Sequence, residues 1–246
     1  MGSARLPGKV LREVCGKPLL GHHLSRLRRA RMVDRLVLAT SDLPADDPIA
    51  EYCREIGVTC YRGDAKDLVS RYKLAVDQEN PAYVIRVTGD CPIIDPHLVD
   101  ELSRAMLASG DEVAMYSLTQ PRFPRGLDAE IMTRAAFDAI AEEATSRYDR
   151  EHVTAFLAKN RHRFPIKTFP SGGNYADYRW VVDYPEDLAF ITALLETLIP
   201  TKPNFNWTEC LDLLRREPGL AELNRHIIAR YNADVAADQA ADRDGR

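Results

Sequence analysis

Apolar runs and amphipathic stretches alternate through the first half of the chain. The segment at 36–40 is a short continuous apolar run, which predicts a buried strand. Similar runs predict strands at 58–61 and 83–87 and a short extended piece at 11–14. Between them, apolar residues recur every three or four positions, which predicts helices at 18–30, 49–56, 67–78 and 95–108. This order predicts an α/β protein with a mostly parallel sheet covered on both faces.

The second half of the chain is less regular. Its apolar pattern predicts strands at 113–117, 127–132, 165–169 and 179–182. Helices are expected at 133–143, 147–159, 185–198, 208–216 and 221–232. The last residues are rich in Ala and Asp and show no periodicity. We therefore expect a single domain over residues 1–232 and a disordered tail over 233–246.

The opening residues combine glycines with cations and contain little that could enter a core. Gly2 and Gly8 let the backbone approach a ligand closely, and Arg5 and Lys9 supply charge for phosphate oxygens. This combination predicts a triphosphate-binding loop. The glycine spacing, and Val10 after Lys9, disfavour a Walker A loop. A basic terminus that binds nothing is the alternative.

Three aspartates follow predicted strands: Asp42, Asp90 and Asp183. In α/β sheets, ligands bind outside the carboxyl ends of the strands. Two carboxylates that converge there suit Mg²⁺, which takes hard oxygen ligands alongside phosphate oxygens. Each aspartate could instead cap the helix that follows it. Two of them opposite a loop with Arg5 and Lys9 favour the metal site.

Length and composition limit the classes of function. The 246 residues carry a net charge of −4, which weakens a case for nucleic acid or an anionic membrane as partner. No apolar run approaches the ~20 residues of a membrane span, and the first twenty residues lack the apolar segment of a signal peptide. The five cysteines are scattered without a C-x-x-C pair, which disfavours structural zinc and disulfides. A cytoplasmic location is expected.

Several sequence blocks occur together and in a fixed order. The opening Met1-Gly2-Ser3-x-Arg5-Leu6-Pro7-Gly8-Lys9 and the later Gly16-Lys17-Pro18-Leu19 resemble the signature of sugar-acid cytidylyltransferases. These enzymes make CMP-activated Kdo, neuraminate and related nonulosonates, and the chain is most similar to their spore coat polysaccharide (SpsF-like) branch. The supporting blocks are Ala39-Thr40-Ser41-Asp42, Thr88-Gly89-Asp90-Cys91-Pro92, Phe123-Pro124-Arg125-Gly126-Leu127-Asp128-x-Glu130, Arg150-Glu151-His152-Val153-Thr154 and Val182-Asp183-Tyr184-Pro185-Glu186-Asp187-Leu188.

The resemblance implies a fold and a reaction. The fold is that of the nucleotide-diphosphosugar transferases, a GT-A or Rossmann-like three-layer α/β sandwich. The reaction is the Mg²⁺-dependent transfer of CMP from CTP to a sugar-acid hydroxyl, with release of pyrophosphate, for surface polysaccharide biosynthesis. The resemblance also implies a homodimer. It leaves the acceptor sugar open.

The resemblance also implies roles for particular residues. The catalytic positions are Arg5, Lys9 and Asp90, and the metal ligands are Asp90 and Asp183. The nucleotide side is implied to include Gly2 and Ser3 of the opening loop, Lys17, Thr40, Ser41, Asp42 and Arg71. The acceptor side is implied to include Arg125, Asp128, Glu130, Arg150, Glu151 and His152.

Such a reaction needs positioning and charge neutralisation more than covalent chemistry. The attacking hydroxyl, the α-phosphorus and the leaving pyrophosphate must lie in line. No nucleophilic Ser or Cys is required, so Cys91 is interpreted as a packing residue. His152 is a candidate for orienting the acceptor, or for packing at a dimer seam.

The start of the chain departs from the resemblance. Relatives begin with an apolar strand before the glycine loop, and this chain begins at the position of their internal methionine. We therefore expect reduced stability and activity for the chain as it stands. Two other functions remain open: a related glycosyltransferase or a nucleotidyltransferase for another base, and a nucleotide-binding homologue without activity.

Overall fold

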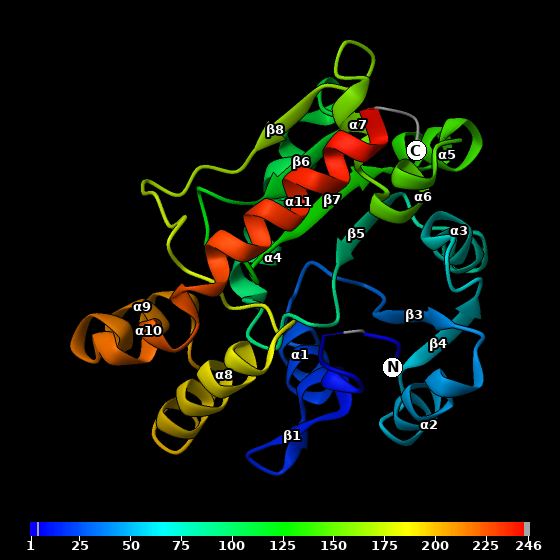
Figure 1. The fold of residues 1–246 in the computed structure, drawn as a ribbon. Coiled ribbons are helices and arrows are strands. Elements are labelled where there is room, and N and C mark those ends of the chain that lie inside the picture. Colours follow the sequence, from blue (N-terminus) through cyan, green and yellow to red (C-terminus); the bar gives the residue numbers. More distant parts are fainter. Residues whose placement is uncertain (4, 244–246) are drawn as a thin grey trace.

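The computed structural model describes residues 1–3 and 5–243 and forms an α/β molecule with two main sheets (Figure 1). The first sheet pairs β3 (Val37–Ser41) with β4 (Thr59–Gly63) in parallel. The second has the order β5-β7-β6-β8 and contains β5 (Tyr83–Val87), β6 (Met115–Leu118), β7 (Ala129–Thr133) and β8 (Ile166–Thr168). A small antiparallel hairpin of β1 (Glu13–Val14) and β2 (Lys17–Pro18) precedes both.

Helices connect the strands throughout the described residues. In the first half they are η1 (Lys9–Leu11), α1 (Leu19–Leu27), η2 (Pro44–Asp46), α2 (Asp47–Glu55), α3 (Leu68–Glu79) and α4 (Pro96–Ala108). In the second half they are η3 (Gly110–Glu112), α5 (Arg134–Glu143), α6 (Arg147–His152), α7 (Ala155–Lys159), α8 (Pro185–Leu198), α9 (Trp207–Arg216), α10 (Pro218–Arg225) and α11 (Ile227–Arg243).

The expected α/β class is confirmed, but a mostly parallel sheet is not. β7 runs antiparallel to both β5 and β6, and only β6 with β8 is parallel in that sheet. The reason is local: β6 and β7 follow each other without a crossover helix, so they pair as neighbouring antiparallel strands. The expected strand at 179–182 is instead a single bridge between Arg125 and Arg179.

Helices cover both faces of the four-stranded sheet. On β7, Ile131 belongs to a core cluster with α4 and α8, and the next residue, Met132, belongs to a second cluster with α5 and α7. Successive strand residues point to opposite faces, so these clusters lie on the two sides of the sheet. Trp180, at 0% exposed, lies in the first cluster, which therefore anchors the segment that leads into Asp183.

Some helix boundaries differ from the prediction. Asp95 caps α4 as expected, because its side chain accepts from His97 N. The helix expected at 147–159 is divided into α6 and α7 at Val153, whose φ is 53°. Helix α11 includes residues 233–243 of the expected tail, and 244–246 lie outside the described residues. None of the described helices combines the length and apolarity needed to cross a membrane.

The two main sheets are not joined by a hydrogen-bonded ladder within the described residues. β3 and β5 instead line one apolar cavity of about 640 Å³. Leu20 and Leu24 of α1 and Val76 of α3 are among the other residues of its wall. This space is referred to below as the apolar cavity.

Candidate active site

A second, polar cavity of about 320 Å³ lies at the carboxyl end of β5. Side chains from distant parts of the chain line it. They are Arg86, Thr88 and Asp90 from β5 and the loop after it, Arg125, Asp128 and Glu130 from the segment before and within β7, Asp183 before α8, Tyr231 of α11, and Arg5. Asp90 lies beyond the end of a strand, where ligands bind in α/β sheets, and it lines this cavity as the sequence predicts.

Lys9 connects the two aspartates that the sequence predicted as partners. Its Nζ donates to Asp90 Oδ2 and to Asp183 Oδ1, each at 2.7 Å. Gly8 makes this possible, because its φ of 70° turns the chain into η1, where Lys9 begins the helix. On the other side, Val182 N donates to Asp90 O at 2.9 Å and holds the two acidic segments together.

The charges in this triad stabilise one another. Burial alone would lower the pKa of Lys9, but Asp90 and Asp183 outweigh it and raise that pKa above its usual value. Burial would raise the pKa of Asp183, yet Lys9 and Arg179 hold it below its usual value. Lys9 therefore stays cationic and Asp183 anionic across the neutral range.

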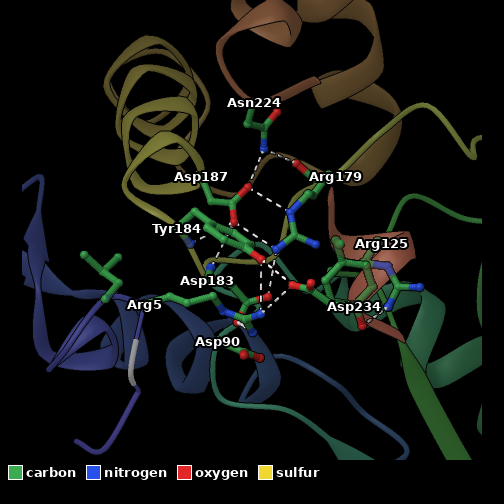
Figure 2. Close-up of polar contacts among 12 residues, drawn as sticks. Arg5, Asp90, Arg125, Arg179, Asp183, Tyr184, Asp187, Asn224 and Asp234 are labelled. Atoms are coloured by element: carbon green, nitrogen blue, oxygen red, sulfur yellow. Dashed lines mark hydrogen bonds and ion pairs between the residues drawn. The ribbon is translucent and has the colours of Figure 1, made fainter. Parts of the chain in front are cut away.

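A buried network fixes the carboxylate of Asp183 from behind (Figure 2). Arg179 Nη2 donates to Asp183 Oδ2 at 2.7 Å, and Arg179 Nε donates to Asp187 Oδ1 at 2.9 Å. Asn224 of α10 donates to the same Asp187 oxygen at 2.9 Å and to Arg179 O at 2.8 Å. Because these side chains are buried and paired, Asp183 cannot turn away from the cavity.

Arg5 approaches the same carboxylate from the opening loop. Its Nη2 lies 3.9 Å from Asp183 Oδ1, and its Nη1 donates to Tyr184 Oη at 3.1 Å. The guanidinium carbon lies 4.8 Å from the centre of the Tyr184 ring, a cation–π distance. Figure 2 shows Arg5 directed toward Asp183 and Asp234. The opening loop thus delivers two cations, Arg5 and Lys9, to one acidic pair.

The acidic pair fits a magnesium ion that is shared with phosphate. The described residues contain no group of three or more His, Cys, Asp and Glu that could enclose a metal ion. Mg²⁺ commonly takes only one or two protein carboxylates and completes its shell with water and substrate phosphates. Asp90 and Asp183 are such a pair, and both already bind one cation, the ammonium of Lys9.

The other wall of the cavity carries Arg86, Asp128 and Glu130. Arg86 Nη1 donates to Glu130 Oε2 at 2.7 Å across the β5–β7 pair, and Thr154 Oγ1 donates to the second oxygen of Glu130 at 2.8 Å. Burial raises the pKa of Asp128, although Gly126 N donates to its Oδ2 at 2.7 Å. This wall therefore contains carboxylates that are already hydrogen-bonded.

Similarity to known proteins identifies the family of this chain. The family model described as Cytidylyltransferase matches residues 1–208. The chain belongs to the cytidylyltransferase family. It is 31% identical to the spore coat polysaccharide biosynthesis protein SpsF of Bacillus subtilis (strain 168), over 90% of this chain and 93% of that protein. It is 34% identical to the 3-deoxy-manno-octulosonate cytidylyltransferase of Anaeromyxobacter dehalogenans (strain 2CP-1), over 56% and 57% of the two chains.

Solved structures agree with this assignment. A cytidylyltransferase from Leptospira borgpetersenii matches 90% of this chain and 92% of its own, with a TM-score of 0.85 and 27% identity. A CMP:2-keto-3-deoxy-manno-octonic acid synthetase complexed with CTP matches 80% and 95%, with a TM-score of 0.62 and 18% identity, and supports the fold. The family resemblance and the expectation of a nucleotidyltransferase are confirmed.

The predicted nucleotide-side residues lie apart from the polar cavity. Thr40 Oγ1 and Ser41 Oγ both donate to Asp46 Oδ2, at 2.9 and 2.5 Å, and Asp42 is exposed beside them. Lys17 lies on the β1–β2 hairpin and donates to Ser25 Oγ at 3.4 Å. Hence the structure places Thr40 and Ser41 beside β4 and Lys17 against α1.

The remaining nucleotide-side candidates lie on the opening loop and on α3. Gly2 is exposed, and Ser3 Oγ accepts from Leu6 N at 3.4 Å. Arg71 packs against Gly63 at the end of β4, and its Nε is buried without a hydrogen-bond partner among the described residues. Arg71 therefore lies at the carboxyl end of the first sheet, near Ser41, rather than at the polar cavity.

The structure separates the predicted acceptor residues into two groups. Arg125, Asp128 and Glu130 line the polar cavity. Arg150 instead joins α6 to α3, because its Nε donates to Asp67 Oδ2 at 2.7 Å and its Nη2 to Ser70 Oγ at 2.9 Å. Glu151 Oε2 lies 3.8 Å from Arg147 Nε, one helical turn earlier.

His152 is exposed on α6 and lies beside Tyr148, with the ring centres 4.2 Å apart and the ring planes tilted by 45°. It therefore lies outside the lining of the polar cavity. Other residues of the cavity and its support were not predicted from the sequence, namely Arg86, Arg179, Asp187, Asn224 and Tyr231. Arg86 could have been identified from the sequence as a candidate functional residue, because a charged residue inside the apolar strand 83–87 is unusual. The others follow only from tertiary contacts.

Proposed function

We propose that this protein transfers CMP from CTP to a hydroxyl of a sugar acid of the Kdo or nonulosonate class, releasing pyrophosphate, in surface polysaccharide biosynthesis. The observation that supports it most is the meeting of Lys9, Asp90 and Asp183, with Arg5 beside them. This set combines two cations for phosphate oxygens with two carboxylates for a divalent ion.

In the proposed reaction, the acceptor oxygen forms a bond to the α-phosphorus of CTP and the bond to the pyrophosphate oxygen breaks. The proton of the acceptor hydroxyl passes to solvent or to a carboxylate of the cavity. Arg5 and Lys9 neutralise the charge that develops on the leaving pyrophosphate. Mg²⁺ held by Asp90 and Asp183 would supply further neutralisation of the triphosphate when bound.

The position of Lys9 also affects how a divalent ion would bind at the acidic pair. Its ammonium lies between the two carboxylates, where a divalent ion would also bind. Asp90 and Asp183 would hold a divalent ion with the same oxygens that now accept from Lys9, and Lys9 would then donate to phosphate oxygens instead. The acidic pair would have a cation beside it in both arrangements.

The test is a pyrophosphate-release assay with CTP, Mg²⁺ and either Kdo or N-acetylneuraminate as acceptor. The proposal predicts release that depends on both CTP and an acceptor, and loss of release when EDTA is added. ATP, GTP and UTP in place of CTP test the choice of base. Turnover with another nucleotide but not with CTP, or transfer of a sugar from a nucleotide sugar, would overturn the proposal.

A further inference from the structure

Helix α11 contributes to the polar cavity from outside the region that the family model matches. The model covers residues 1–208, and α11 begins at Ile227. Figure 1 shows α11, in red, in front of β6 and β7, and Figure 2 shows Asp234 of this helix between Arg5 and Arg125. Tyr231, one turn earlier, lines the cavity itself.

Tyr231 makes two different contacts with Arg125. Arg125 Nη1 donates to Tyr231 Oη at 3.1 Å. The guanidinium carbon of Arg125 also lies 4.5 Å from the centre of the Tyr231 ring, and that of Arg179 lies 4.7 Å from it. The electron-rich ring face attracts both cations, so Tyr231 lets two guanidinium groups lie near each other.

Arg125 forms its hydrogen bonds with neutral groups. Gln120 Oε1 accepts from its Nε at 3.3 Å, and Arg125 forms no ion pair with the carboxylates whose side chains the structure describes, although its charge opposes the rise in the pKa of Asp128. Lys9 and Arg179, by contrast, each contact two aspartates. A guanidinium that lines a polar cavity and has hydrogen bonds to neutral groups presents its charge to a ligand.

We propose that Tyr231 is a positioning residue that holds the Arg125 guanidinium toward the carboxylate of the acceptor. The proposal rests on the proposed function, because it requires an acceptor that carries an acid group. The hydroxyl of Tyr231 sets the direction of Nη1, and the ring limits how far the guanidinium can turn. The long Arg125 side chain then loses less conformational freedom when a carboxylate binds.

Two substitutions separate these contributions. Tyr231→Phe removes the hydroxyl that accepts from Arg125 and keeps the ring, while Tyr231→Leu removes both. We expect KM for Kdo to rise roughly fivefold in the first and roughly thirtyfold in the second, from the worth of one neutral hydrogen bond and of one partly desolvated cation–π contact. In Tyr231→Phe, KM for CTP and kcat should stay close to wild type, because the hydroxyl that is removed accepts from Arg125, whereas the ring beside Arg179 is kept.

A second readout does not depend on the acceptor. Phenylglyoxal modifies accessible guanidinium groups, and mass spectrometry follows Arg125 with the exposed Arg54 as internal reference. We expect Arg125 to react several-fold faster in Tyr231→Phe and faster again in Tyr231→Leu. Tyr61→Phe is the matched control, because its hydroxyl donates to Glu79 at 2.8 Å, away from the cavity. Tyr61→Phe should change neither KM for Kdo nor the reactivity of Arg125 with phenylglyoxal.

The outcomes distinguish the two proposals. A wild-type enzyme that releases no pyrophosphate with any sugar acid contradicts the proposed function, and with it the acceptor role of Arg125. Unchanged Arg125 reactivity in both Tyr231 variants overturns the positioning role itself. If Arg125 reacts faster but KM for Kdo is unchanged, Tyr231 orients a guanidinium that does not bind the acceptor, and the proposal is wrong. Normal circular dichroism of Tyr231→Phe excludes misfolding as the cause.

Discussion

The two cavities beside β5 differ in size and in chemistry. The apolar cavity, about 640 Å³, is twice the volume of the polar one, about 320 Å³. Its walls are strands β3 and β5 with leucines of α1. Asp90 and Asp183 line the smaller cavity, and each accepts from Lys9 Nζ at 2.7 Å. Its paired charges, rather than its volume, identify it as the catalytic candidate.

Burial of side chains affects the free energy of folding in opposite ways beside the two cavities. Beside the apolar cavity, Leu20 and Leu24 are each 2% exposed and contribute by their removal from water. In the polar cavity, burial costs free energy for each charge, and hydrogen-bonded partners of opposite sign offset that cost. Substitutions in the first region should therefore change stability, and substitutions in the second should chiefly change turnover.

The largest effect is expected at the acidic pair. Asp90→Asn keeps the shape of the side chain and removes the charge that binds Lys9 and, in the proposed function, a divalent ion. We expect kcat for pyrophosphate release to fall by about 10²–10³-fold, as when one electrostatic contact to the transition state is removed. Asp212→Asn, a change of an exposed aspartate that pairs with Arg215, is the control and should keep wild-type turnover.

The matching change beside the apolar cavity is Leu24→Ala. It removes a buried side chain from a wall that already adjoins empty space, so we expect a loss of about 2–5 kcal/mol in the free energy of unfolding. Urea denaturation measures it, with Leu223→Ala, at an exposed leucine, as control. A loss of turnover larger than the loss of folded protein would contradict the division between the regions.

Gly126 follows Arg125 in the chain and has a φ of 105°. A Cβ there would lie 2.5 Å from the backbone carbon of Trp180. Gly126→Ala should therefore cost roughly 1–3 kcal/mol in the free energy of unfolding, through backbone strain and displacement of Trp180. Gly219→Ala has open space and an ordinary φ, and thermal melting should show no loss for it. Equal melting temperatures for the two variants would refute the steric argument.

The smallest effect is expected where Arg150 contacts α3, away from both cavities. Burial would raise the pKa of Asp67, but Arg150 and Ser70 outweigh it and lower that pKa. A lowered folded-state pKa gives stability that is present above the unfolded value of about 3.9 and is lost as pH falls through the folded value.

Asp67→Asn should therefore cost about 0.5–1 kcal/mol at neutral pH, and the difference from wild type should shrink below about pH 4. Urea titrations between pH 3 and pH 7 measure this difference. Turnover at pH 7 should stay unchanged, because the Asp67–Arg150 pair does not line the polar cavity. A difference that grows on acidification would show that the ion pair is not its source.

Local pattern was enough to predict the parts of the site that follow strands and caps. The apolar run 83–87 and the glycine after it place Asp90 at a strand end, and Asp95-Pro96 marks the start of α4. The resemblance carried by the motif blocks implied that Asp90 and Asp183 act together as metal ligands. The structure then brought both to Lys9, a contact between segments that are far apart in sequence.

Tertiary contacts determined what the pattern could not predict. Residues 179–182 have the composition of a strand, yet they bond alternately to Arg125 and Asp90 instead of to a neighbouring strand. The Arg179–Asp187–Asn224 network joins α8 to α10, and no spacing rule links its members. Tyr231 lies in a helix without amphipathic periodicity, so only its contact with Arg125 reveals its place in the cavity.

The central claim is that Asp90 and Asp183 share one cation. Electron paramagnetic resonance of Mn²⁺, titrated into the protein with CTP, measures this most directly. The account predicts one bound Mn²⁺ per chain in the wild type, and an affinity at least tenfold weaker in Asp90→Asn, in Asp183→Asn and, to a similar degree, in the double variant. Wild-type Mn²⁺ affinity in either single variant would contradict the shared site.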